Sequence, residues 1–194
     1  MIILIGFSGT GKSTVAKAVE STNPKFKTYS AGKWARELVP EGSDREVITR
    51  AAIEVLQKTP LRSTYKIYDF LIERYHFAGN DEGLKYSIIE GIRNPIDLMN
   101  IFLYGQNRSD PVNLKFIFTF GDEGAATDME YHGVQSCLEV AQWMRAMGYI
   151  GANDIVLYDK TIIKDGDINK VKEAVAPFLQ DWKYEISLTS EIEK

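Results

Sequence analysis

Five short strand-like runs occur along the chain, four of them rich in apolar residues, and longer amphipathic stretches lie between these runs. The runs predict β-strands at 2–5, 27–30, 86–90, 114–119 and 154–158. Apolar positions at helical spacing predict helices at 44–58, 63–77, 95–104, 134–148 and 168–182. Strands that alternate with helices are typical of a mostly parallel sheet with helices on both faces. The pattern therefore predicts an α/β fold of three layers around a five-stranded parallel sheet.

The segment between the second and third predicted strands is too long for a single crossover. Residues 31–84 hold several helical patterns, which predicts a helical inserted lobe beside the sheet. The rest of the chain up to residue 182 fits one domain, and residues 183–194 form a polar, acidic tail. We therefore expect a single domain over 1–182 with one inserted lobe.

The composition indicates which binding partners and which cellular compartment are expected for the protein. The 194 residues are 44% apolar and 26% charged, and the net charge of −4 argues against a broad polynucleotide-binding face. The charge balance therefore disfavours nucleic acid as a partner. Cys137 is the only cysteine, so no intramolecular disulfide can form and a reducing compartment is expected. No apolar run reaches 18 residues, and the first residues form a strand rather than a basic leader. We expect a soluble, cytoplasmic protein with no membrane partner.

The first strand runs directly into a glycine-rich turn at residues 6–13. The turn reads Gly-Phe-Ser-Gly-Thr-Gly-Lys-Ser, which is the G-x-x-x-x-G-K-[ST] pattern of a phosphate-binding P-loop between a strand and a helix. Lys12 is expected to contact the β- and γ-phosphates, and the Ser13 hydroxyl is expected to ligate Mg²⁺. The residues predicted to bind the nucleotide are Gly9, Thr10, Gly11, Lys12, Ser13 and Thr14. The turn predicts that the chain binds a nucleoside triphosphate, ATP, together with Mg²⁺.

Charged residues follow the second and third strands at the points where these strands end. Glu90 closes the third strand and is the expected second partner of Mg²⁺, directly or through water. Arg93 follows three residues later, and Arg36 lies one helical turn beyond Gly32 after the second strand. Because the carboxyl ends of parallel strands meet at one edge, both guanidinium groups are predicted to hold a second phosphate opposite the triphosphate. The alternative is that both arginines are partners in surface ion pairs.

Two segments beside the P-loop resemble those of nucleoside monophosphate kinases. Residues 30–36, Ser-Ala-Gly-Lys-Trp-Ala-Arg, resemble the Ser-Thr-Gly-Asp-x-x-Arg segment of adenylate kinases. Residues 90–93, Glu-Gly-Ile-Arg, resemble the Asp-Gly-Ile-Arg segment of archaeal adenylate-kinase-like or dephospho-coenzyme-A-kinase-like proteins and of some phage deoxynucleotide kinases. The resemblance covers about residues 1–120. The last strand and helix also follow in the same order as in the family.

The resemblance implies the P-loop NTPase fold, with the acceptor bound by the lobe at about 31–84. It also implies a lid-like segment at about 120–135, between the fourth and fifth strands. The implied activity is an ATP- and Mg²⁺-dependent transferase reaction, in which the γ-phosphoryl group moves to a (deoxy)nucleoside monophosphate. Lys12, Arg36 and Arg93 are the catalytic residues that it implies.

The expected lid departs from the family pattern because it contains no arginine. Family members carry several arginines there, which neutralise the phosphoryl group during transfer. Residues 121–132 instead carry four carboxylates, which are expected to repel phosphates unless the segment stays open or binds Mg²⁺: Asp122, Glu123, Asp128 and Glu130. A replacement cation is therefore predicted from the inserted lobe, with the candidates Arg45, Arg50 and Arg62. Arg108 and Arg145 are the alternatives outside the lobe.

Two other readings of the function stay open. The acceptor is alternatively dephospho-coenzyme A, or hydroxymethyluracil within phage DNA, although the acidic balance of the chain disfavours DNA. A nucleotide-gated switch ATPase would need a strand-terminal Asp-x-x-Gly segment, and none stands in the expected place. His76 and His132 each lack a second metal ligand at zinc-like spacing, so neither is assigned a catalytic role.

Overall fold

The computed structural model describes residues 1–58, 85–106, 114–120, 128–159 and 167–179. Within these residues the centre of the molecule is an all-parallel sheet in the order β2-β3-β1-β4-β5. Its strands are β1 (Ile2–Gly6), β2 (Lys27–Ser30), β3 (Ser87–Glu90), β4 (Lys115–Phe120) and β5 (Ile155–Asp159). All five strands coincide with predicted ones to within one residue at each end. The predicted α/β class and five-stranded parallel sheet are thus confirmed.

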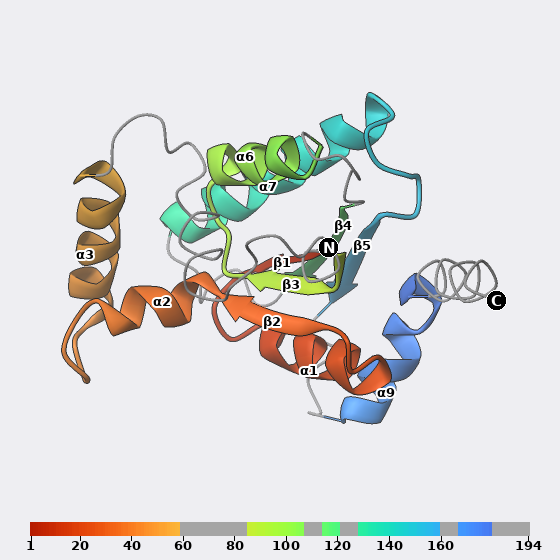
Figure 1. The fold of residues 1–194 in the computed structure, drawn as a ribbon, viewed down its shortest axis with the longest axis horizontal. Helices are drawn as coiled ribbons and strands as arrows, with labels where there is room; N and C mark the ends of the chain where they lie inside the picture. The colour runs from red at the N-terminus through yellow and green to blue at the C-terminus, as the bar shows by residue number, and fades with distance from the viewer. Residues whose placement is uncertain (59–84, 107–113, 121–127, 160–166, 180–194) are drawn as a thin grey trace, which may run out of the picture.

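Helices cover both faces of this sheet (Figure 1). One face is covered by α6 (Pro95–Gln106) and α7 (Asp128–Ala146). The other face is covered by α1 (Lys12–Thr22) and α9 (Ile168–Val175), which is followed by the 3-10 helix η2 (Pro177–Leu179). The three layers follow from the strand pattern, because continuous apolar runs bury both faces of a parallel sheet.

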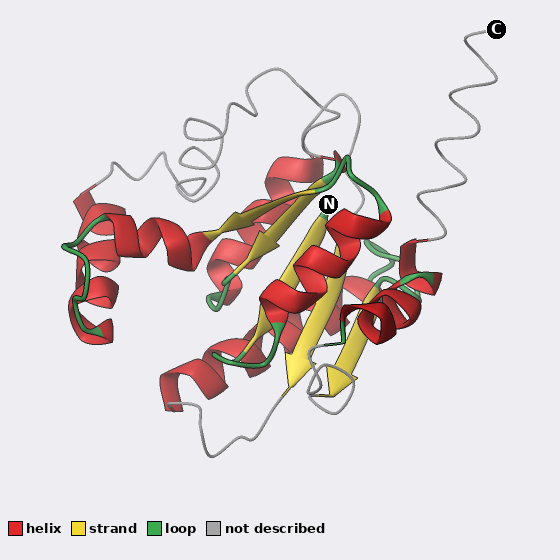
Figure 2. Cartoon of the chain, turned by 90° about the horizontal axis from the view of Figure 1, so that it is seen from below, coloured by secondary structure: helices red, strands yellow, loops and turns green. Residues whose placement is uncertain are grey.

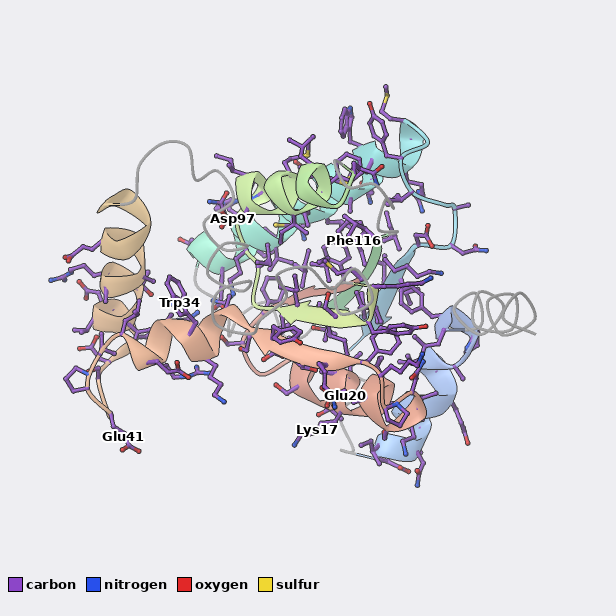
Figure 3. All side chains as sticks on the ribbon, viewed as in Figure 1. Lys17, Glu20, Trp34, Glu41, Asp97 and Phe116 are labelled. Atoms are coloured by element: carbon purple, nitrogen blue, oxygen red, sulfur yellow. The ribbon has the colours of Figure 1, made fainter. Side chains whose placement is uncertain are left out.

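Successive residues of each strand enter two separate hydrophobic cores. Ile3 and Ile5 pack with α6 and α7, whereas Ile2 and Leu4 pack with α1 and α9. Phe116 is fully buried in the first core, and Figure 3 shows it between the sheet and the helices above. The alternation is the period of two that a strand imposes on its side chains.

Two helices extend from the end of β2 beyond the edge of the sheet (Figures 1 and 2). They are α2 (Ala31–Glu37) and α3 (Arg45–Lys58), and they form the described part of the predicted inserted lobe. The Ser30 hydroxyl accepts a hydrogen bond from the Lys33 backbone N–H at 3.2 Å, which caps α2. The predicted helix at 63–77 lies outside the described residues.

The α7 helix begins about six residues earlier than predicted, at Asp128 instead of 134. Asp128 and Glu130 lie in its first turn, where negative side chains stabilise the positive end of the helix dipole. The predicted lid-like segment is thus helical from Asp128 onward, and its residues 121–127 lie outside the described part of the chain.

The final helix is shorter than predicted. The α9 helix ends at Val175 and gives way to η2 at Pro177, a residue that cannot donate the backbone hydrogen bond of a helix interior. Its predicted cap is confirmed, since the Asp167 side chain accepts from the Asn169 backbone N–H at 2.9 Å. Among the helices described, none is long and apolar enough to cross a membrane.

Candidate active site

The turn between β1 and α1 has the backbone shape of a phosphate-binding loop. Gly9 and Gly11 have φ angles of 77° and 82°, a left-handed conformation that side-chain-bearing residues rarely adopt. Gly6 lies so close to Thr119 on β4 that a Cβ at this position would collide with it. Thr10 fixes the loop from inside, because its hydroxyl lies 2.8 Å from the Phe7 carbonyl oxygen and 2.7 Å from the Thr119 hydroxyl.

The Lys12 ammonium and several backbone N–H groups supply the positive charge of the turn. Lys12 Nζ donates to the carbonyl oxygens of Gly6 at 2.9 Å and Phe7 at 2.6 Å. Within the described residues, no protein acceptor receives the backbone N–H of Gly9 or those of residues 11–13. These N–H groups and the start of α1 have the arrangement that binds anions such as the phosphates of a nucleotide in other proteins.

Burial lowers the pKa of Lys12 from its ordinary value of 10.5 to about 8. The neighbouring Arg93 charge acts in the same direction, and the carboxylates of Glu90 and Glu130 partly oppose both effects. At neutral pH the ammonium group therefore stays mainly protonated, as a phosphate ligand must be.

Ser13 and Glu90 lie together beside the loop, as the sequence predicted for a Mg²⁺ site. The Ser13 hydroxyl donates to Glu90 Oε2 at 3.5 Å, and Glu90 ends β3 directly beside β1. A hydroxyl and a carboxylate suit Mg²⁺, which takes few protein ligands and completes its shell with phosphates and water. No cluster of three or more His, Cys, Asp or Glu side chains suited to a metal occurs in the described residues.

The ends of β2 and β3 approach each other through two glycines. A Cβ at Gly91, whose φ is 92°, would lie 3.3 Å from the backbone nitrogen of Gly32. Arg36 Nη2 lies beside the same junction, 4.0 Å from where a Cβ on Gly32 would be. Arg36 is exposed, and it makes no ion pair with any residue in the described ranges. The alternative of a surface ion pair therefore has no support for Arg36 among the described residues.

Arg93 takes a different direction from Arg36, toward the P-loop. Its Nη2 lies 3.2 Å from the Ser8 hydroxyl, and its Nη1 lies 2.9 Å from Glu130 Oε1. The main chain at Arg93 is held by α7, where Gly133 approaches its carbonyl oxygen so closely that a Cβ would collide. Arg93 does form an ion pair, and this pair lies at the phosphate-binding loop instead of on a remote surface.

Glu130 is the point where four segments meet. Its Oε1 accepts from the Ser8 backbone N–H at 3.1 Å and from the Ser8 hydroxyl at 2.9 Å. The same oxygen lies 2.9 Å from Arg93 Nη1 and 2.9 Å from Arg45 Nη2 of α3. The Glu130 side chain is 2% exposed. The first turn of α7 thus joins the P-loop, the β3–α6 loop and the start of α3.

Glu130 remains ionised despite its burial. Burial by itself raises the pKa of a carboxyl group, but hydrogen bonds from Arg45 and Ser8 and the charges of Arg93 and Arg45 outweigh it. Together they lower the pKa from 4.5 to about 2. The expectation that Glu130 repels bound phosphates is therefore corrected, because two guanidinium groups compensate its charge.

The other arginines considered from the sequence lie elsewhere. Arg50 pairs with Glu46 on the exposed side of α3 at 2.7 Å. Arg145 is in the last turn of α7, and fifteen residues of helix, about 22 Å, separate it from Glu130. Arg62 and Arg108 lie outside the described residues, as do Asp122, Glu123 and His76. His132 is exposed on α7 beside the Tyr131 ring.

Four residues of this site did not emerge from sequence reasoning as contributors to it. Ser8, Thr119 and Gly133 were not considered, and Glu130 was considered only as a source of repulsion. Thr119 has a recognisable signal, since it is a polar residue in an otherwise apolar stretch of β4. Glu130, Gly133 and Ser8 have no such local signal, because their partners are 37 or more positions away in sequence.

Comparison with known proteins finds solved structures of weak similarity and assigns the chain to no family. No protein-family model matches the sequence, and no curated protein matches it. A kinase candidate of Chloroflexus aurantiacus is 17% identical, with a TM-score of 0.47 over 93% of this chain and 95% of the other. A sugar kinase from a Janibacter species is 13% identical, with a TM-score of 0.43 over 92% and 93% of the two chains. A gluconokinase of Sinorhizobium meliloti is 14% identical, with a TM-score of 0.43 over 95% of each chain. All three are named kinases, but at this level of similarity none bears on the substrate of this chain.

Proposed function

We propose that the protein is a P-loop kinase that transfers the γ-phosphoryl group of ATP to a nucleoside monophosphate. The observation that carries the proposal is the contact between Arg93 and Ser8 of the P-loop, at 3.2 Å. It puts a guanidinium group that follows β3 directly against the loop that binds the donor. An acceptor phosphate held by such a group would lie next to the γ-phosphate, which is the alignment that phosphoryl transfer needs.

The donor side of the reaction uses the P-loop. The free N–H groups of Gly9 and residues 11–13 and the Lys12 ammonium would hold the triphosphate, with Thr10 fixing the loop and Thr14 following in the first turn of α1. Ser13 and Glu90 would hold Mg²⁺, which supplies charge neutralisation on the β- and γ-phosphates when bound. Both sets of ligands face the same end of the sheet.

The acceptor side uses the ends of β2 and β3. Arg36 lies beside the Gly32–Gly91 junction and Arg93 lies against Ser8 of the P-loop, so an acceptor phosphate held between the two arginines would lie next to the donor site. A phosphate acceptor already carries a nucleophilic oxygen, so transfer depends on positioning and charge neutralisation more than on a general base. The lobe at 31–84 is proposed to bind the rest of the acceptor.

The decisive experiment is an ADP-release screen with Mg·ATP and the common ribo- and deoxyribonucleoside monophosphates. Dephospho-coenzyme A and an oligonucleotide containing hydroxymethyluracil serve as the alternative acceptors, and Lys12→Ala serves as the inactive control. We expect ADP release that depends on one or a few monophosphates. Turnover with only an alternative acceptor would change the substrate class. ADP release that no acceptor stimulates would indicate a nucleotide-gated ATPase instead.

A further inference from the structure

The cation that the expected lid lacks has a replacement from a different part of the chain. Arg45 begins α3, and its Nη2 lies 2.9 Å from Glu130 Oε1. The same oxygen accepts two hydrogen bonds from Ser8 of the P-loop. Only one carboxylate oxygen therefore separates the Arg45 guanidinium from the loop that holds the donor phosphates.

The charges at this point favour an incoming phosphate. Arg45 and Arg93 bring two positive charges to one carboxylate, and Lys12 adds a third positive charge nearby. The group around Glu130 is therefore net positive. The Arg45 side chain is 53% exposed, whereas that of Glu130 is 2% exposed. Glu130 is thus the fixed partner, and Arg45 retains freedom to move onto a ligand.

The remaining described arginines do not share this position. Arg50 lies on the same helix as Arg45 but pairs with Glu46, and its side chain is 64% exposed. Arg145 is separated from Glu130 by about 22 Å of helix. Arg36 lies at the Gly32 junction, on the acceptor side. Arg36 and Arg93 are proposed to bind the acceptor. Among the other described arginines, Arg45 is therefore the one that lies near the P-loop.

We propose that Arg45 is a catalytic residue that neutralises the γ-phosphoryl group during transfer, and that Glu130 is its positioning residue. The inference rests on the proposed kinase function and names the cation that completes it. An oxygen of the acceptor phosphate forms a bond to the γ-phosphorus while the bond to the β–γ bridging oxygen breaks. ADP leaves with that electron pair, so no external proton or electron is required. Arg45 would balance the negative charge on the equatorial oxygens during this exchange.

The test compares Arg45→Ala, Arg45→Lys and Glu130→Gln with Arg50→Ala, a matched control on the same helix. We expect Arg45→Ala to lower kcat at least about 100-fold with the KM for ATP nearly unchanged. Free guanidinium at low millimolar concentration should restore part of the lost kcat, and Arg45→Lys should retain more activity than Arg45→Ala. Arg50→Ala should behave as the wild type. Normal kcat in Arg45→Ala, or a loss that neither guanidinium nor lysine reduces, would overturn the proposal.

The positioning role of Glu130 is tested by combining the variants. Glu130→Gln keeps the size of the side chain and loses its charge, and we expect kcat to fall about tenfold or more at saturating acceptor. Because Glu130 is proposed to act through Arg45, the double variant should have the kcat of Arg45→Ala alone. A further drop of tenfold in the double variant would mean that Glu130 affects the rate independently of Arg45.

A binding experiment separates this inference from the proposed function. Aluminium fluoride mimics the γ-phosphoryl group beside Mg·ADP, and its binding needs no turnover of any acceptor. We expect wild-type protein to bind Mg·ADP more tightly with aluminium fluoride than without it, and Arg45→Ala to lose that gain while Arg50→Ala keeps it. If the screen finds no acceptor but this pattern holds, the proposed acceptor fails and the role of Arg45 stands. A gain that persists in Arg45→Ala, or that is absent from the wild type, overturns the inference.

Discussion

At the scale of single residues, Lys12 has two partners within its own loop. Its ammonium group donates to the carbonyl oxygens of Gly6 and Phe7 and thereby closes the turn. A bound triphosphate offers the same donor stronger, charged acceptors. The hydrogen bonds to Gly6 and Phe7 thus keep the side chain near the place where phosphate is expected.

Lys12→Ala should reduce phosphoryl transfer at least about 100-fold, because it removes the cation that is proposed to contact the β- and γ-phosphates. The unfolding temperature without ligand should change little, since the side chain belongs to neither hydrophobic core. Steady-state kinetics and thermal unfolding measure the two effects. Full turnover in this variant would remove the P-loop lysine from the mechanism.

Arg36→Ala and Arg93→Ala should each raise the acceptor KM by about tenfold or more, with the KM for ATP changed less than about threefold. The reason is that Arg36 lies beside the Gly32–Gly91 junction and Arg93 follows β3, so both are proposed to hold the acceptor phosphate and neither is part of the turn at 6–13. Initial rates at varied acceptor and varied ATP distinguish the two sides. An equal loss of ATP affinity in both variants would assign them to the donor.

Arg93 needs one additional control because it also pairs with the buried Glu130. Arg93→Ala leaves that carboxylate with fewer partners, and unfolding measurements should show a loss of stability that Arg36→Ala does not show. Arg93→Lys keeps the positive charge and should recover part of this stability.

At the scale of elements, the contact between α7 and the β3–α6 loop depends on one glycine. Alanine normally stabilises a helix interior relative to glycine, but a Cβ at Gly133 would collide with the Arg93 carbonyl oxygen. Gly133→Ala should therefore lower the free energy of unfolding by about 1–3 kcal/mol and raise the acceptor KM. Urea unfolding and initial rates measure both effects.

Gly32→Ala is the matched control for this helix–loop contact. Gly32 lies in α2, and the nearest atom that a Cβ there would meet within the described residues is Ser30 Oγ, at 3.9 Å. The variant should be as stable as the wild type or up to about 1 kcal/mol more stable. Equal stabilisation of both variants would show that α7 does not depend on the small residue at 133.

The α6 helix contains a carboxyl group that opposes folding at neutral pH. Burial raises the pKa of Asp97, seen at the start of α6 in Figure 3, from 3.8 to about 6. The native state therefore binds the proton more tightly than the unfolded state, and stability falls as pH rises from about 4 to 6. The nearby Cys137 stays a neutral thiol over this range, because burial and the Asp97 charge raise its pKa to about 12.

Asp97→Asn removes this titration. The variant should gain stability over the wild type as pH rises from 4 to 7, by up to about 3 kcal/mol. Asn94 caps the helix in both proteins through its hydrogen bond from the Ile96 N–H at 2.9 Å, so the start of α6 is preserved. Urea unfolding at pH 4, 5, 6 and 7 measures the difference. A difference that does not vary with pH would contradict the titration.

At the scale of the whole molecule, the strand order gathers the site at one end of the sheet. β1 lies between β3 and β4, so the P-loop is flanked by Glu90 of β3 and Thr119 of β4. The lobe that begins with α2 returns to this place through Arg45. A ligand in the P-loop would therefore lie close to residues of β3, α7 and the start of α3.

Mg·ATP should accordingly stabilise the entire domain against unfolding. At a concentration of 100 times Kd, binding to the native state adds about 2.7 kcal/mol, which corresponds to an increase in unfolding temperature of roughly 5–11 °C. Thermal unfolding with and without Mg·ATP measures the increase, and Lys12→Ala should lose most of it. The same increase in Lys12→Ala would place the nucleotide outside the P-loop.

The sequence by itself determined the parts of this protein whose causes are local. The strands other than β2 follow from short apolar runs, and β2 follows from a strand-like run of mixed polarity. The turn at 6–13 follows from the spacing of its glycines, and the cap of α9 follows from Asp167. Each of these features depends on residues a few positions apart, so it can be recognised without knowing which distant residues pack against it. The positions of Ser13 and Glu90 follow as well, since parallel strands end at one edge.

Only the tertiary structure decided how the charges around the loop combine. A glutamate after β4 reads from the sequence as a repulsive group, but packing of α7 buries Glu130 against Ser8, Arg93 and Arg45. The sign of its effect depends on partners 37 to 122 positions away, and no local pattern records such distances. The close approach of Gly133 to Arg93 depends in the same way on how α7 packs against the β3–α6 loop. Long-range packing therefore determines which charges compensate one another, because electrostatic energy depends on separation in space and on burial.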